Sequence, residues 1–161
     1  MPATSTQTAI FAAGCFWGVE ELFRKLDGVM ETSVGYTGGM TEAPTYEDVC
    51  SSATGHAEAV KITYDPAKIS YDKLLETFFD NHNPTTPNQQ GPDFGSQYRS
   101  AVFYESDEQR AAAERCKEKV EKSGRWKKPV VTQIVPAQTF YPAEDYHQKY
   151  LMKRGLGSCH I

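Results

Sequence analysis

The first clear feature of the sequence is an apolar segment that passes into a helix without an intervening loop. Residues 8–13 are apolar enough for a buried strand, and Gly14 follows them directly. From Phe16 to Leu26 the apolar residues recur at helical spacing, with charged residues on the opposite side. Cys15 lies between the strand and the helix, so the sequence predicts that it occupies a helix N-terminus.

This position favours a reactive thiolate at Cys15. The unpaired N–H groups and the positive end of the helix dipole stabilise an anion there. Placement at a helix N-terminus is one of the ways in which the pKa of a cysteine is lowered. The adjacent Phe16 and Trp17 could form an apolar wall against a small hydrophobic substrate group. The alternative is a small buried cysteine that packs among core aromatics and has no chemical role.

The rest of the chain alternates between strand and helix patterns. We expect strands at 29–36, 56–64, 99–104 and 130–135, helices after Ser70, after Ser106 and from Pro142 or Ala143, and a long loop at 81–97. The order up to Tyr104 is β-α-β-β-α-β, which is the order of ferredoxin-like folds. The sequence therefore predicts an α+β fold with a ferredoxin-like split β-α-β core, in which helices flank a mixed sheet. An extra helix, strand and helix follow at the C-terminal end.

The composition is that of a single soluble domain. The chain has 161 residues, 39% of them hydrophobic, and a net charge of −4. We expect one catalytic domain over 1–161, with a frayed segment at 1–6 and a mobile tail at 155–161. The negative charge argues against binding to nucleic acid or an anionic membrane. No basic leader or bilayer-spanning run is visible, so we expect a cytoplasmic protein. We also expect a monomer.

The four cysteines do not have the spacing of a CxxC motif or a zinc site. The histidines likewise show no metal-ligand spacing, so we expect no metal. Cys159 follows two glycines near the C-terminus, where a mobile thiol could approach another one. The alternative is a bystander thiol. We interpret Cys50 and Cys116 as bystanders.

Glu58 lies in a strand pattern whose two faces both carry candidate core residues. It shares one face with Val60 and Ile62. A carboxyl group on an apolar face favours its protonated form, and such a group can donate a proton near neutral pH. In the alternative, Glu58 faces solvent and the face of Ala57 and Ala59 is the buried one.

Two tyrosines and an aspartate are further candidates. Tyr46 and Tyr98 lie in or beside irregular segments, where a phenol could donate a hydrogen bond to a polar substrate oxygen. The alternative is a pair of partly buried loop tyrosines. Asp93 lies between Gly91-Pro92 and Phe94-Gly95, and turn formation accounts for an aspartate there.

Five blocks of the sequence, in this order, resemble the peptide methionine sulfoxide reductase A family. They are Gly14-Cys15-Phe16-Trp17-Gly18, Gly35-Tyr36-Thr37-Gly38-Gly39, Tyr46–Cys50 followed by Thr54–Val60, Gly91–Ser100, and Asp145–Gln148 with Tyr150-Leu151. The blocks extend from residue 14 to the tail, and five in the right order are specific. Ser51-Ser52-Ala53 departs slightly, because a glycine is common near Ser52, and this concerns the shape of a loop.

The resemblance implies a peptide-methionine (S)-S-oxide reductase that acts on methionine S-sulfoxide, free or in oxidised proteins. Cys15 would be the nucleophile and Glu58 the acid. The remaining implied site residues are Tyr46 and Tyr98 as donors to the sulfoxide oxygen, Phe16 and Trp17 around the substrate methyl group, and Asp93 in the polar network of the pocket. Cys159 resembles a resolving cysteine that forms a single disulfide with Cys15. Thioredoxin or another dithiol would reduce that disulfide, without a metal or an organic cofactor.

Two other interpretations fit parts of the sequence. A thiol peroxidase or a cysteine-dependent hydrolase would also use Cys15, but a hydrolase would need a histidine base beside it. A non-catalytic module could use the aromatic residues to bind methyl or ammonium groups. Turnover of methionine sulfoxide separates the reductase from both alternatives.

Overall fold

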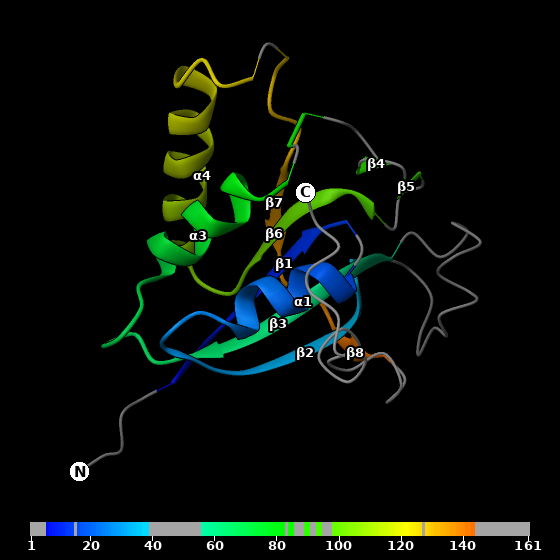
Figure 1. Cartoon of the computed structure of the whole chain (residues 1–161), viewed down its shortest axis with the longest axis vertical. Helices are drawn as coiled ribbons and strands as arrows, with labels where there is room; N and C mark the ends of the chain where they lie inside the picture. Colours follow the sequence, from blue (N-terminus) through cyan, green and yellow to red (C-terminus); the bar gives the residue numbers. More distant parts are fainter. Residues whose placement is uncertain are drawn as a thin grey trace.

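A six-stranded mixed sheet forms the centre of the molecule (Figure 1). The computed structural model describes residues 6–14, 16–38, 56–82, 84–85, 89–90, 93–94, 98–126 and 128–143, and only the backbone of 16–18, 89–90 and 93–94. The elements are β1 (Gln7–Ala13), α1 (Phe16–Arg24), β2 (Val29–Thr37), β3 (Ala57–Tyr64), α3 (Tyr71–Asp80), β4 (Gln89–Gln90), β5 (Asp93–Phe94), β6 (Ser100–Tyr104), α4 (Asp107–Lys122), β7 (Gln133–Pro136) and β8 (Tyr141–Pro142).

The four central strands have the ferredoxin-like arrangement that the sequence predicts. The sheet order is β7-β6-β1-β3-β2-β8, and the pairs β6–β1, β1–β3 and β3–β2 are antiparallel. β7 adds to one edge parallel to β6, and β8 adds to the other edge antiparallel to β2. The parallel β6–β7 pair makes the sheet mixed, so the predicted fold class is confirmed.

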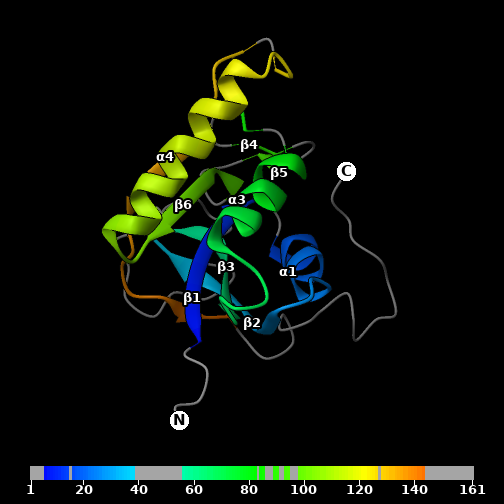
Figure 2. The same ribbon diagram turned by 90° about the vertical axis from the view of Figure 1, so that its left-hand side faces the viewer.

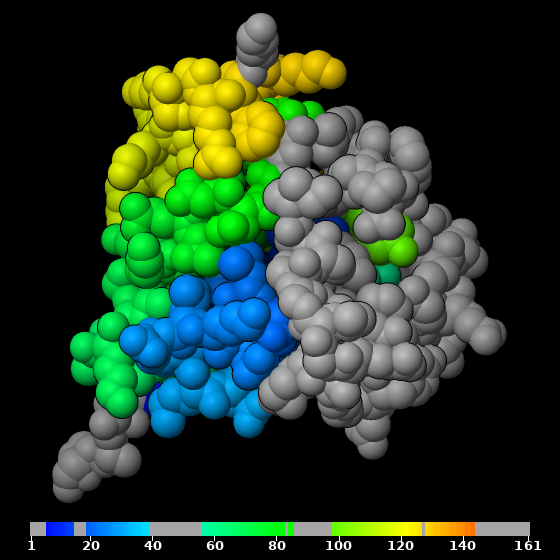
Figure 3. Space-filling model, viewed as in Figure 1, coloured from blue at the N-terminus to red at the C-terminus, as the bar shows by residue number. Residues whose placement is uncertain are grey.

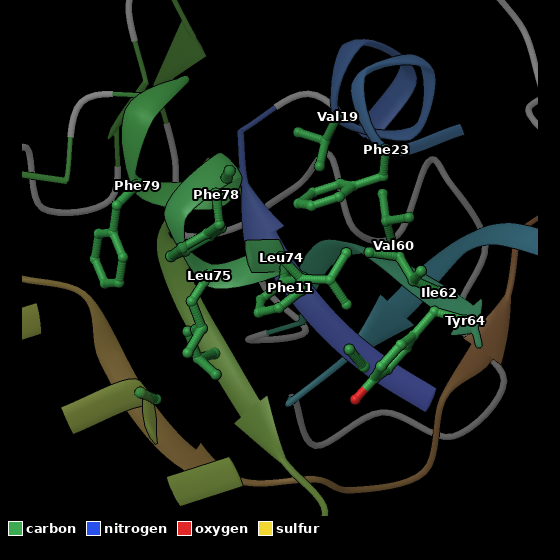
Figure 4. Packing of buried hydrophobic residues seen from close by; sticks show 14 of the residues in the cluster. Phe11, Val19, Phe23, Val60, Ile62, Tyr64, Leu74, Leu75, Phe78 and Phe79 are labelled. Atoms are coloured by element: carbon green, nitrogen blue, oxygen red, sulfur yellow. The ribbon is translucent and has the colours of Figure 1, made fainter. Parts of the chain in front are cut away.

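Three helices cover one face of this sheet and form the main core with it (Figures 1, 2 and 4). Phe11 of β1 lies at the centre, and its ring stacks on Phe23 of α1 at 5.4 Å and on Phe78 of α3 at 5.2 Å. Val60 and Ile62 of β3 lie in the same cluster. In the space-filling view α1, α3 and α4 lie side by side on this surface (Figure 3). None of the helices in the described ranges is long and apolar enough to cross a membrane.

The opposite face of the sheet is also buried, and its side chains are smaller. This second cluster contains Ile10, Ala12, Ala57, Ala59, Ala101 and Phe103, with Val135, Ala137 and Phe140 packed against it. Both faces of β3 are therefore buried from Ala57 to Val60, whereas Lys61 and Thr63 are half-buried. One consequence is that a residue on either face of this first half of β3 is removed from water.

The helices that follow β3 and β6 begin at serine caps. Ser70 Oγ accepts from Lys73 N at 3.0 Å, and Ser106 Oγ accepts from Gln109 N at 3.2 Å. A serine in this position pairs a backbone N–H group that has no partner within the helix. Both predicted helix starts are confirmed.

The structure corrects three expectations about secondary structure. The strand expected at 130–135 begins at Gln133, because Val131 N donates to Pro84 O at 2.7 Å. Pro142 does not start a helix; it belongs to β8 and pairs with Gly35. An edge strand accepts a proline as readily as the first turn of a helix does. The rest of that predicted helix lies outside the described residues. The segment expected as a loop at 81–97 contains the paired strands β4 and β5.

β2 begins with an irregularity at the end of the sheet where β1 also starts. The pairing of β2 with β3 shifts between Val29 and Glu31, and Met30, between them, is 62% exposed. Such a bulge leaves one residue unpaired and turns it out of the ladder. Met30 is therefore a large apolar side chain in contact with solvent.

Candidate active site

The junction between β1 and α1 is a sharp turn that depends on glycine. β1 ends at Ala13, α1 begins at Phe16, and the buried Gly14 has a φ of 101°. Only glycine adopts such a positive φ without strain. Cys15 therefore lies between the end of β1 and the first residue of α1, which is the position that the sequence predicts. The structure of Cys15 itself, and the side chains of Phe16 and Trp17, lie outside the described residues.

A row of four residues crosses the sheet at this end of β1: Ser100, Ala13, Glu58 and Tyr36. Ser100 pairs with Ala13, and Tyr36 pairs with Glu58. The antiparallel pairing of β1 with β3 extends to Phe11 and Val60, and the same register carried on by two residues brings Ala13 level with Glu58. The register thus places a carboxyl group and a phenol beside the turn that precedes Cys15.

Glu58 lies on the face of β3 that the helices cover. Its side chain is 1% exposed, and Val60, two residues further along the same face, is in the main core. The alternative in which Glu58 faces solvent is therefore wrong. Removal of a carboxyl group from water disfavours its charged form. This arrangement is suited to a group that donates a proton.

Tyr98 and Arg99 precede β6 and approach the same end of the sheet. Both are half-buried. Burial lowers the pKa of Arg99, and its Nε donates to Gln133 Oε1 at 3.2 Å. The Arg99 Nη2 atom lies against Gly38, where an added Cβ would be 3.0 Å away. The guanidinium group of Arg99 therefore lies at the end of β2.

Sequence reasoning assigned no role to Tyr36 or Arg99. Both belong to blocks that resemble the reductase family, and this resemblance is the sequence feature that could have marked them as site residues. Their position beside the site follows from the strand register. Of the predicted site residues, Glu58 and Tyr98 lie at this end of the sheet. Tyr46 and Cys159 lie outside the described residues, and Asp93 is described only as backbone paired with Gln90.

Cys116 lies away from this end, on α4, and packs at the edge of the main core. Burial is the largest influence on its thiol and raises the pKa to about 11. The thiol is therefore protonated at neutral pH, which agrees with its interpretation as a bystander. Within the part of the chain that the structure describes, no three His, Cys, Asp or Glu side chains gather as they would around a metal ion.

A hollow of about 710 Å³ lies at the other end of β1, with Gln7, Tyr71 and Glu105 among its lining residues. The row that contains Glu58 does not contribute to this hollow. The chemistry predicted from the sequence therefore belongs to the opposite end of the strand.

Comparison with known proteins identifies the family. A family model described as peptide methionine sulfoxide reductase matches residues 7–161. The chain belongs to the peptide methionine sulfoxide reductase family. It is 56% identical over 158 residues to the peptide methionine sulfoxide reductase MsrA of Methanoculleus marisnigri, which covers 98% of this chain and 96% of the relative. The protein is thus an enzyme, and it reduces methionine sulfoxide at the expense of thiols.

Solved structures support the same assignment. The crystal structure of Mxr1 from Saccharomyces cerevisiae in reduced form matches with a TM-score of 0.88 and 37% identity, over 97% of this chain and 90% of that chain. A structure of Mxr1 in complex with Trx2 matches with a TM-score of 0.65 over 99% of this chain and 91% of that chain. The second match is only 24% identical and shows the likeness of fold alone.

Proposed function

We propose that this reductase acts on the S epimer of methionine sulfoxide, free or within proteins, through a sulfenic acid on Cys15. The observation that carries the proposal is the burial of Glu58 beside the turn that precedes Cys15. A proton donor and a thiolate at a helix N-terminus are the two groups that reduction of a sulfoxide needs.

The first step transfers oxygen from the substrate to the enzyme. The Cys15 thiolate attacks the sulfoxide sulfur and forms a sulfur–sulfur bond, while Glu58 protonates the sulfoxide oxygen. The hydroxyl group then moves to the Cys15 sulfur as the sulfur–sulfur bond and the substrate S–O bond break, so that methionine leaves with an unoxidised thioether and Cys15 becomes a sulfenic acid. Tyr46 and Tyr98 donate hydrogen bonds to the oxygen as negative charge develops, as preorganised donors do in other enzymes.

Substrate recognition uses the start of α1. Phe16 and Trp17 hold the methyl group of the substrate, and Asp93 belongs to the polar network of the same pocket. With the methyl group and the oxygen fixed in different places, the pocket accepts one configuration at sulfur. This supports selectivity for the S epimer, because separate enzymes reduce the two sulfoxide epimers.

Cys159 resets the enzyme in the second half of the cycle. Its thiol condenses with the Cys15 sulfenic acid, which releases water and forms an intramolecular disulfide. Thioredoxin, or another dithiol, reduces this disulfide by exchange. Mxr1, which in its reduced form is 37% identical to this chain, has also been solved in complex with Trx2, and this supports thioredoxin as the partner. The cycle uses only an external dithiol, which suits a single catalytic domain in the reducing cytoplasm.

The test is mass spectrometry after one equivalent of methionine S-sulfoxide. The wild-type protein should yield one methionine and a Cys15–Cys159 disulfide. Cys15→Ser should yield no methionine, and Cys159→Ser should complete one turnover but lose recycling by thioredoxin. Continued turnover by Cys15→Ser would contradict the proposed nucleophile. Full recycling by Cys159→Ser would assign the resolving thiol to another cysteine.

A further inference from the structure

Three buried polar side chains from distant parts of the sequence form a hydrogen-bond chain beside the end of β1. His82 Nε2 lies 2.7 Å from Ser100 Oγ, and Ser100 Oγ lies 2.7 Å from Thr132 Oγ1. The three residues are 3%, 3% and 2% exposed, respectively. The other ring nitrogen, His82 Nδ1, lies 2.6 Å from Phe78 O near the end of α3.

The direction of the hydrogen bonds follows from their end point. A carbonyl oxygen only accepts, so Nδ1 of His82 carries a proton and donates to Phe78 O. In the neutral ring Nε2 is then an acceptor, and the Ser100 hydroxyl donates to it. The single proton of Ser100 is thereby used, so Thr132 donates to Ser100 Oγ. A buried network in which each member has its partner is rigid and holds one arrangement.

Ser100 is the member of this chain that touches the candidate site. It pairs with Ala13, and Gly14 and Cys15 follow Ala13 in the sequence. In the other direction, Tyr98 lies two residues before Ser100. Ser100 therefore connects the segment that leads to the proposed nucleophile with the segment that carries a proposed donor to the sulfoxide oxygen.

The other two members fix Ser100 from opposite sides. His82 ties it to the end of α3, where the imidazole ring also packs against Phe78 with centroids 4.4 Å apart. Thr132 ties it to the segment before β7, and the neighbouring Val131 N donates to Pro84 O at 2.7 Å. Ser100 thus has little freedom to move across or along the sheet.

Stability alone does not require polar side chains at these places. A set of apolar side chains of matching shape is often as stable as a buried hydrogen-bonded set. We propose that His82, Ser100 and Thr132 are positioning residues that fix Tyr98 relative to Cys15. The proposal rests on the roles of Cys15 and Tyr98 in the proposed function. Displacement of reacting groups by 1 Å can lower a rate by about 100-fold.

The experiment compares the removal of buried hydroxyl groups at two places. Thr132→Val and Ser100→Ala break the chain. Thr77→Val is the matched control, since Thr77 is also buried and donates to Lys73 O at 3.0 Å within α3. For each variant we would measure the saturating single-turnover rate, the substrate concentration for half-maximal rate, and the thermal unfolding midpoint.

We expect Thr132→Val and Ser100→Ala to lower the saturating rate about 10- to 100-fold, because the donor and nucleophile lose their alignment. The half-maximal concentration should change little, since neither residue contacts the substrate. Thr77→Val should lower the unfolding midpoint by a similar amount and keep the wild-type rate. A conservative pair adds a rescue test: His82→Gln retains an acceptor for Ser100 and should recover part of the rate that His82→Leu loses.

The proposal is overturned if Thr132→Val keeps a rate within twofold of Thr77→Val, or if His82→Gln and His82→Leu are equally slow. The rates of Thr132→Val, His82→Gln and His82→Leu test the positioning role even if Ser100→Ala does not fold. Failure of the proposed function is a separate result, since it requires turnover by Cys15→Ser. That variant is measured in the same assay.

Discussion

At the scale of single residues, Glu58 combines two properties that the fold imposes together. It extends from the first half of β3, where both faces are buried, and the register places it beside Tyr36 and level with Ala13. In the proposed mechanism this carboxyl group supplies the proton to the sulfoxide oxygen. The reaction should therefore depend on its ability to carry a proton, more than on its shape.

Glu58→Gln should lower the single-turnover rate of methionine sulfoxide reduction by about 10²–10⁴-fold, because the amide fills the same space but does not deliver a proton. Rapid quenching followed by measurement of methionine gives the rate. Asp65→Asn is the control, since Asp65 is a buried carboxylate at the far end of the same strand and accepts from Ala67 N at 2.9 Å. A Glu58→Gln rate close to that of Asp65→Asn would remove Glu58 from the acid role.

The sequence predicts the face on which Glu58 lies, since the alternation with Val60 and Ile62 is clear. It does not distinguish one buried face from two, because alanines at 57 and 59 suit either a buried or an exposed surface. Tyr36 and Arg99 were missed for a different reason. The pairing of Tyr36 with Glu58 and the place of Arg99 beside Gly38 depend on which strands are neighbours and in which register, and neither is encoded in a local pattern.

At the scale of secondary structure, the turn from β1 to α1 is the element on which the site depends. Gly14 has a φ of 101°, a conformation that strains any residue with a Cβ. The turn directs the chain from the sheet into the helix layer within two residues. A change of backbone at Gly14 would therefore alter the direction in which Cys15 leaves the sheet.

Gly14→Ala should reduce both stability and turnover, whereas Gly124→Ala should reduce stability alone. Gly124 also has a positive φ, of 76°, but lies after α4 with no atom within 4 Å of an added Cβ. We expect each variant to lose about 1 kcal/mol or more of unfolding free energy from backbone strain. Denaturant titrations and single-turnover rates measure the two effects. Equal rates for both variants would contradict a role for the turn in catalysis.

The central strands and the helices with serine caps were predicted from periodicity, but the strands at the edges of the sheet were not. β8 has two residues, which is too short for a periodic signal, and its proline also suits a helix start. The β-branched residues at 130–132 resemble a strand, yet the Val131 N–H bonds to Pro84 O and not to the sheet. Such short elements are decided by contacts with distant segments.

At the scale of the whole molecule, the proposed site and the open hollow lie at opposite ends of the sheet. One end carries the turn before Cys15, together with Glu58 and Tyr98. The other end carries the open hollow near Gln7 and the bulge at the start of β2. Strands rise about 3.3 Å per residue, so Met30 lies about 20 Å along β2 from Tyr36. The organisation as one domain over the full chain stays a prediction.

The exposure of Met30 has a consequence for the enzyme population. An exposed thioether is open to oxidation by peroxide, and its sulfoxide is the chemical group that this family reduces. Met30 is too far from its own site to enter it, so a second copy of the enzyme has to perform the reduction. Each molecule is then both a catalyst and a substrate of its neighbours.

After treatment with peroxide and addition of a dithiol, peptide mapping should show Met30 sulfoxide disappearing at a rate that rises with enzyme concentration. Roughly half should remain, because each sulfoxide epimer has its own reductase. Oxidised Cys15→Ser should not recover alone but should recover when wild-type protein is added. A rate independent of concentration would indicate reduction within one molecule. The rate at which oxidised Met30 is repaired thus depends on how often two copies of the enzyme meet.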